Sequence, residues 1–337
     1  MNEVGPQHPL SYRQDILRPM FAHLRAGDSC ALIGPASMGK SRLLQFILRP
    51  DVKAHYLTDR AANTLLLQAD CQQMGCAAEW GLHELLLTAI IKKGGQQHPK
   101  VNERRRDFNE LREPVILEQN TLLALRHLEL ALQLLIEDMK LKVCFLIDEF
   151  DAMYQSLPAQ ALANLRGMRD DFKYDLNYVI FLRNEPHLVR DPADCEGFYE
   201  LFSRSLHGLG PYNQADAMQM MVQLEERFSR PASSEVKAAI YHLSGGHPGL
   251  ILALIDLYAR QPALPFADLP ANLPAYPTLM EECRKLWHGL PPDEQDAMAA
   301  GSPPPAGLRQ RLELKGLLQA GMPFSPLFAA YTHTVRR

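Results

Sequence analysis

Two short strings in this sequence carry residue types suited to holding a nucleoside triphosphate. The first spans residues 34–41 and fits the phosphate-loop pattern G-x-x-x-x-G-K-[ST]. Its members are Gly34, Pro35, Ala36, Ser37, Met38, Gly39, Lys40 and Ser41. An apolar segment at about 29–33 precedes it and a helical run at 40–49 follows it, which is the context this pattern requires.

The residue types explain how such a loop would bind phosphate. Gly34 and Gly39 let the backbone wrap so that its N–H groups point inward, and the following helix contributes the positive end of its dipole. Lys40 is expected to reach the β- and γ-phosphates. The Ser41 hydroxyl is expected to ligate Mg²⁺.

The second string is an apolar strand at 143–148 that ends in two acids. Asp148, at its carboxyl end, would hold the metal ion together with Ser41. Glu149 is the candidate base that orients and deprotonates the attacking water. The two strings together predict an enzyme that binds ATP with Mg²⁺ and hydrolyses it, with Lys40 and Glu149 as catalytic residues.

Composition sets the broad class of the protein. A chain of 337 residues with 47% apolar and 22% charged residues is expected to form two or three ordinary globular domains. No apolar run approaches the roughly 18 residues of a membrane helix, and the N-terminus lacks secretory-signal features, so we expect a cytoplasmic protein without a membrane partner. The net charge of −4 argues against coating nucleic acid by bulk electrostatics.

Strand-like and helical segments alternate up to about residue 211, which predicts an α/β domain with a parallel sheet covered on both faces. Strands are expected at 29–33, 64–69, 143–148, 178–182 and 206–209, and helices at 14–24, 40–49, 78–92, 117–139 and 158–170. Leucines such as Leu122 and Leu130 are expected to pack the long helix at 117–139 against the sheet. The intervening residues 93–115 are polar. Five basic and four acidic residues between 100 and 113 favour a solvated, charge-laced loop or helix end over a nucleic-acid patch.

The rest of the chain divides further. Helices at 214–229, 233–243 and 248–260 predict a small helical lid domain over 212–261, after a P-loop ATPase domain over 1–211. A proline-rich stretch at 262–277 is expected to be a linker. Residues 278–337 have the size and order of a winged-helix-like domain.

This order resembles the AAA+ and STAND branches of the P-loop ATPases over nearly the whole chain. Residues 10–13, ending in Tyr12 and Arg13, look like the "F/Y-x-x-R" box that precedes the phosphate loop in bacterial AAA-like ATPases. Residues 35–41 are similar to their "P-R-x-M-G-K-S" loop, and the acidic strand matches in kind. We count Arg13 and Arg42, which follows the loop motif, among the nucleotide-binding residues.

The resemblance also implies residues that sense or complete the site. Arg183 ends a strand where STAND proteins carry an arginine, and Asn184 beside it fills the polar-sensor position of ordinary AAA+ proteins; a merely solvated strand end is the alternative. Arg204 lies in a segment that looks like the arginine-finger region of origin-initiator AAA+ proteins, against the alternative of an intrachain salt bridge. A finger acting on a neighbouring subunit implies a homo-oligomer with shared ATP sites.

Two further stretches carry resemblances to known families. Gly246, His247 and Pro248 look like the "G-x-P" box of STAND and archaeal-type ATPases, and the backbone at Pro248 is expected to face the nucleotide. No arginine follows this box until Arg260, so the sensor arginine of ordinary AAA+ proteins is missing from its usual place. Residues 324–328 resemble the closing strand of a winged helix.

Three functions stay open. One is an ATPase that couples nucleotide state to conformational change and assembly, and the alternative is a slow nucleotide-dependent switch that docks a partner protein. The third is DNA contact through the winged helix, but seven basic and six acidic residues between 272 and 337 nearly cancel.

Overall fold

The computed structural model describes residues 8–300 and 303–335. The chain divides into two compact units, each described here by itself. The sheet unit comprises Asp15–Leu32 and Leu44–His207, and the loop unit comprises Met1–Gln14, Ile33–Leu43 and Gly208–Arg337. Among the described helices, none is both long and apolar enough to cross a membrane.

The sheet unit is built on five strands in the order β2-β3-β4-β1-β5. Their bounds are Cys30–Ile33 for β1, Thr64–Asp70 for β2, Lys142–Asp148 for β3, Leu176–Leu182 for β4 and Leu206–Gly208 for β5. β3 pairs in parallel with both β2 and β4, and every residue of β1 and β4 is buried. Such continuous burial is expected of parallel strands that are covered on both faces.

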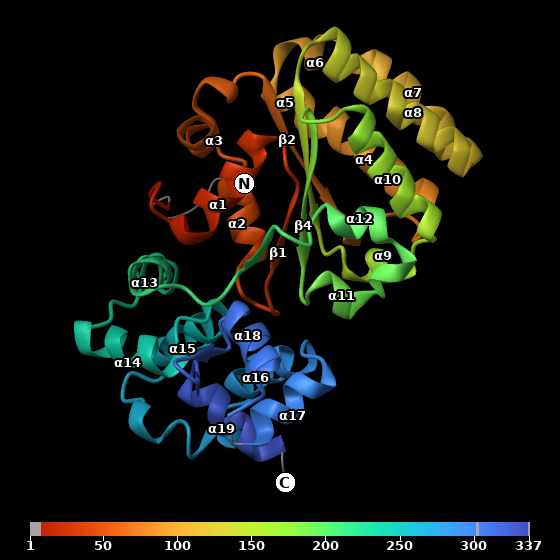
Figure 1. The fold of residues 1–337 in the computed structure, drawn as a ribbon. Coiled ribbons are helices and arrows are strands. Elements are labelled where there is room, and N and C mark those ends of the chain that lie inside the picture. The colour runs from red at the N-terminus through yellow and green to blue at the C-terminus, as the bar shows by residue number, and fades with distance from the viewer. Residues whose placement is uncertain (1–7, 301–302, 336–337) are drawn as a thin grey trace. The chain divides into compact units, whose positions relative to one another are not determined.

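Helices cover both faces of this sheet (Figure 1). α1 (Gln14–Ala26) and α3 (Pro50–Leu57) lie on one side, and α10 (Ala159–Asp171) and α12 (Glu196–Glu200) lie on the other. α1 buries Ile16, Leu17, Met20, Phe21 and Leu24, the helical stripe predicted from the sequence. α2 (Lys40–Ile47), α4 (Glu79–Ala89), α9 (Asp151–Ser156) and α11 (Pro186–Val189) complete the α/β part of the chain.

The segment between α4 and β3 differs from the expectation. After the short helices α5 (Gly95–Gln97) and α6 (Pro99–Glu103), it forms α7 (Arg105–Glu118) and α8 (Thr121–Gln133), which contact each other. The single helix expected at 117–139 starts later, because Gln119 takes a left-handed conformation and the Asn120 side chain caps the backbone N–H of Leu123. Leu122 and Leu130 are 62% and 48% exposed, so the prediction that they pack on the sheet was wrong.

Three capped helices of the loop unit agree with the sequence expectation: α13 (Gln214–Phe228), α14 (Ser234–Ser244) and α15 (Pro248–Arg260). The proline-rich stretch after them packs rather than running free, since Leu269 and Leu273 are buried. α16 (Pro277–His288), α17 (Pro292–Ala300), α18 (Ala306–Leu314), the hairpin of β6 (Leu318–Gln319) and β7 (Met322–Pro323), and α19 (Pro326–Val335) follow.

The closing strand expected at 324–328 is wrong. Helix α19 begins at Pro326, because the Ser325 hydroxyl accepts a hydrogen bond from the backbone N–H of Phe328 and proline suits the first helical turn.

Candidate nucleotide-binding site

The phosphate loop joins β1 to α2 and curves around its own lysine. Gly39 has a φ of 84° and Ser37 a φ of 59°, both in the left-handed region. Lys40 is only 7% exposed, and its Nζ donates a hydrogen bond of 3.0 Å to the carbonyl of Gly34. Ser41 is exposed in the first turn of α2, where backbone N–H groups lack partners within the helix. The loop therefore places a cation beside the N-terminus of a helix, and both features favour phosphate binding.

Arg13 ties this loop to the start of the helical part of the loop unit. Its buried guanidinium donates from Nη2 to the carbonyl of Met38 (3.0 Å) and from Nη1 to the carbonyls of Gly210 (2.6 Å) and Pro211 (3.1 Å). It also stacks over the ring of Tyr212, with its central carbon 4.3 Å from the ring centroid. Arg13, expected to bind nucleotide, thus positions the loop by holding its backbone.

Two tyrosines lie against each other beside the phosphate loop. The hydroxyls of Tyr12 and Tyr212 lie 2.7 Å apart, and burial together with the nearby Tyr212 raises the pKa of Tyr12 well above its usual value. A Cβ on Gly39 would lie 3.0 Å from the Tyr212 hydroxyl and 3.7 Å from Cγ of Pro248. Glycine is therefore required at position 39 by its positive φ and by this close approach.

His247 is a buried contact of the loop that the sequence prediction missed. Its Nδ1 accepts a hydrogen bond from the backbone N–H of Leu250, which caps α15, and its Nε2 lies 3.2 Å from the carbonyl of Ala36. These partners require the neutral ring with its proton on Nε2. Burial lowers the pKa of His247 to about 4, against a smaller opposing effect of the Ala36 carbonyl. The sequence signal was an N-cap residue directly before Pro248 at the first helical position.

The acidic edge lies in the sheet unit, where β2 and β3 end. Asp70 and Asp148 are opposite each other in register, and Asp148 is buried with its Oδ1 accepting from the N–H of Glu149 at 3.0 Å. Burial and the charges of Asp70, Asp148, Glu149 and Asp151 raise the pKa of Cys71 to about 12. Negative charge is therefore concentrated at this edge of the sheet.

Arg183 and Glu149 are brought together at the same edge. The Arg183 Nη2 donates to Glu149 Oε2 at 2.9 Å, and the Arg183 backbone N–H donates to Asp151 Oδ1 at 2.9 Å. Asn184 follows, partly buried. Glu149 itself has a φ of 51°, an uncommon conformation for a residue with a side chain.

Arg204 lies at the opposite edge of the sheet, where β1 and β4 begin. Ser205, the residue after it, accepts at its carbonyl from the N–H of Ala31, and Ser29 Oγ accepts from the N–H of Tyr178. Because β3 spans seven residues at about 3.3 Å each, roughly 20 Å separates the two edges. Arg204 is exposed and makes no hydrogen bond or ion pair within the described part of the chain.

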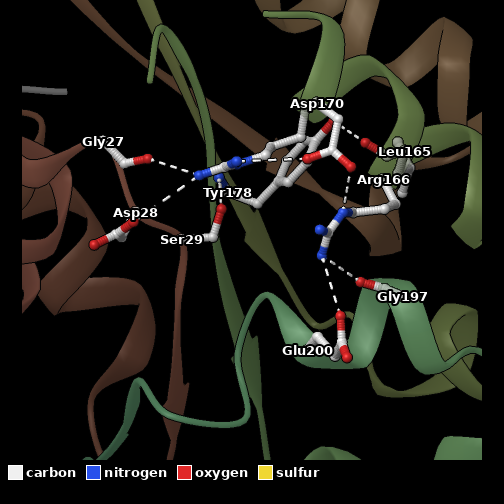
Figure 2. Close-up of polar contacts among 10 residues, drawn as sticks. Gly27, Asp28, Ser29, Leu165, Arg166, Asp170, Tyr178, Gly197 and Glu200 are labelled. Carbon is white, nitrogen blue, oxygen red and sulfur yellow. Dashed lines mark hydrogen bonds and ion pairs between the residues drawn. The ribbon is translucent and has the colours of Figure 1, made fainter. Parts of the chain in front are cut away.

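A cavity of about 580 Å³ opens beside Arg204. It is lined by three arginines and two acids, together with serines and Leu201: Arg166, Arg169, Arg204, Asp28, Glu200, Ser29, Ser203 and Ser205. Figure 2 shows how its walls are fixed: Arg166 donates to Asp170 at 2.7 Å and to the carbonyl of Gly197 at 2.7 Å. Arg204 thus belongs to a polar, arginine-rich surface in the sheet unit.

The residues predicted to hold Mg²⁺ have suitable chemistry. Ser41 offers a hydroxyl oxygen and Asp148 a carboxylate oxygen whose position is fixed by the N–H of Glu149. Mg²⁺ prefers oxygen ligands and usually keeps several waters, so one or two protein ligands suffice.

Comparisons with known proteins bear on the fold. No protein-family model and no curated protein matches this chain. The solved structure of the Walker-type ATPase PABY2304 of Pyrococcus abyssi is similar at 15% identity and a TM-score of 0.54, over 97% of this chain and 99% of that one. ORC2 of Aeropyrum pernix (15%, TM-score 0.49, over 93% and 81%) and Cdc6p of Pyrobaculum aerophilum (14%, TM-score 0.43, over 98% and 96%) are also similar.

Only the first of these likenesses has a TM-score above 0.5 and bears on the architecture. The likeness extends over nearly the whole of both chains and supports the α/β architecture described above. This chain therefore has the fold of the P-loop, Walker-type ATPases, as the sequence predicted.

Proposed function

We propose that this protein binds ATP with Mg²⁺ and hydrolyses it. The observation that carries the proposal is the buried ammonium of Lys40, held by the Gly34 carbonyl inside the phosphate loop. In a phosphate loop of this pattern, the lysine at this place reaches the β- and γ-phosphates of a nucleoside triphosphate.

Each residue then has a distinct task. Loop N–H groups and Lys40 hold the β- and γ-phosphates, and Arg42 and the backbone at Pro248 contribute to the nucleotide site. Ser41 and Asp148 would hold Mg²⁺, which neutralises charge on the triphosphate when bound. Glu149 accepts a proton from the attacking water.

Arg183 and Asn184 are proposed to stabilise the γ-phosphate. Since Arg183 is paired with Glu149 in this structure, turnover requires that it release the carboxylate. The Arg183–Glu149 ion pair then represents the state of the acidic edge before hydrolysis.

Arg204 is proposed to complete the site of a neighbouring copy. Two facts support this role: its side chain is unpartnered among the described residues, and the sheet separates it from Glu149. An arginine so far from its own acidic edge is suited to act on the site of another subunit, which implies a head-to-tail homo-oligomer.

The binding test compares Lys40→Ala with Lys173→Ala by calorimetric titration of ATP and Mg²⁺. Loss of a charge-assisted contact to phosphate should weaken binding at least about 100-fold in Lys40→Ala and leave Lys173→Ala unchanged. Equal affinity of Lys40→Ala and the wild type would refute the proposal.

The assembly test mixes two inactive variants. The Arg204→Ala variant retains Glu149, and the Glu149→Gln variant retains Arg204. A mixed assembly therefore contains some interfaces at which both intact groups are present. Activity should return on mixing and rise with protein concentration. If Arg204 acts within its own subunit, the mixture stays inactive.

The second candidate function is a slow switch that docks a partner protein, which the Arg183–Glu149 ion pair favours because it occupies the candidate base. Slow turnover that does not depend on protein concentration would support it. DNA is the less favoured partner, because the five described basic residues beyond position 277 all pair with acids: Arg284, Lys285, Arg309, Arg311 and Lys315. Arg336 and Arg337 lie outside the described residues.

A further inference from the structure

Three segments of the loop unit meet at Gly249, the second residue of α15. A Cβ at this position would overlap Oε2 of Glu282 and would lie 2.9 Å from Cβ of Ser37. Ser37 belongs to the phosphate loop and Glu282 to α16, so the absence of a side chain on Gly249 lets both approach one point. A carboxylate from the C-terminal part of the chain therefore lies beside the phosphate loop.

The two oxygens of this carboxylate are in different situations. Oε1 pairs with Lys285 at 2.6 Å, whereas Oε2 is buried and accepts no hydrogen bond within the described residues. The Glu282 side chain is 14% exposed. Its charge is also felt at His247, where it opposes the lowering of the pKa.

A fixed anion at this place opposes a second anion in the phosphate loop. Like charges repel more strongly here than in water, because burial lowers the effective dielectric constant. A purely structural role for Glu282 is the competing explanation, since a carboxylate near the N-terminus of α15 stabilises that helix.

We propose that Glu282 is an internal anion that weakens nucleotide binding at the phosphate loop and couples nucleotide occupancy to α16. The inference rests on the proposed function and adds its regulation. Repulsion should be greater for ATP than for ADP, because ATP carries more negative charge. By reciprocity, nucleotide in the loop disfavours the position of α16 seen here, which gives the C-terminal part of the chain a means of sensing the site.

The test measures Kd for ATP and for ADP by calorimetry in Glu282→Gln, with Glu281→Gln as matched control. Glu281 is the preceding residue, is 41% exposed and pairs with Arg284. Glu282→Gln should bind ATP about tenfold more tightly, and ADP by a smaller factor, while Glu281→Gln should match the wild type. Unchanged affinity in a Glu282→Gln protein that melts at or below the wild-type temperature would overturn the proposal and leave the structural role.

A second variant tests the direction of the effect. Lys285→Gln removes the cation that partly neutralises Glu282, so ATP binding should weaken severalfold. In the Glu282→Gln background the same change should do nothing, since its effect passes through Glu282. If it weakens binding equally in both backgrounds, Lys285 acts on the phosphates directly and the proposal fails.

The two proposals fail in different ways. A wild-type protein that binds neither nucleotide refutes the proposed function before Glu282 is tested. A wild type that binds ATP, with Glu282→Gln unchanged, refutes only the internal anion.

Discussion

The guanidinium of Arg183 holds the carboxylate of Glu149, with 2.9 Å between Nη2 and Oε2. Glu149 also takes a left-handed backbone conformation, which costs about 1 kcal/mol or more in a residue with a side chain. Strain and an ion pair thus coincide at the residue expected to act as the base. Such strain persists only where the surrounding structure imposes it.

Replacing the base should separate binding from chemistry. Glu149→Gln keeps the size of the side chain but cannot accept a proton, so ATP hydrolysis should fall by about 10²–10⁴-fold while the Kd for ATP stays within about threefold. Phosphate release and calorimetry measure the two quantities. Glu113→Gln, at an exposed position of α7, is the control, and a parallel loss of binding would contradict the role of Glu149.

Replacing Arg183 decides between its two possible effects. If Arg183 moves to the γ-phosphate, Arg183→Gln should lower kcat by about 10–10³-fold, because a cation is lost where charge develops. If Arg183 only restrains Glu149, the variant should turn over faster than the wild type. We expect the decrease, measured by steady-state hydrolysis at saturating ATP.

Replacing Arg13 should lower the stability of the folded protein. Arg13→Ala leaves the carbonyls of Met38, Gly210 and Pro211 without their donor, and we expect a loss of about 3 kcal/mol in the free energy of unfolding. Arg18→Ala, at an exposed position of α1, should change it by less than about 0.5 kcal/mol. Urea denaturation compares them, and equal midpoints would contradict the positioning role.

His247 should make stability depend on pH. Its pKa is about 4 in the folded protein and 6.5 when unperturbed, so between these values the unfolded chain binds more protons. The contribution of neutral His247 to the free energy of unfolding is then fully present above about pH 6.5. It is lost as the pH falls toward 4, by up to about 3 kcal/mol. His247→Asn keeps a capping side chain but cannot titrate, and its unfolding free energy should change less between pH 7.5 and 5. An identical pH profile would contradict the assignment.

Replacing His83 should raise stability rather than lower it. It is fully buried on α4, neither ring nitrogen has a hydrogen-bond partner among the described residues, and burial lowers its pKa to about 4. His83→Leu, of similar volume, should raise the unfolding free energy by about 1 kcal/mol at pH 7 and remove part of the acid sensitivity. A lower stability at pH 7 would show that the ring makes a contact that leucine cannot replace. This variant is also the cleaner background for the His247 titration.

The sequence predicted well those features that depend on neighbouring residues. The phosphate loop, the acidic strand and helices such as α1 and α13 follow from short patterns of glycine, charge and apolar spacing. The start of α8 was missed because it depends on the conformation of Gln119, and leucine content alone did not reveal that Leu122 faces solvent.

The environment of the loop could not be predicted from local patterns. Arg13 contacts Gly210 across 197 positions, and His247 contacts Ala36 across 211. Such contacts depend on which distant backbone carbonyls the fold brings within reach. A buried histidine before a proline reveals a helix cap, but it does not reveal which loop the other ring nitrogen will meet.

The separation of Arg204 from Glu149 has a stoichiometric consequence for any head-to-tail assembly. If Arg204 acts in trans as proposed, each copy that joins completes the nucleotide site of its neighbour while its own site stays incomplete until another copy binds. An open row then always has one incomplete site at its end. Specific activity per chain would climb with row length and reach its ceiling only if the row closes on itself. In short rows, ATP bound at the incomplete terminal site would therefore stay unhydrolysed.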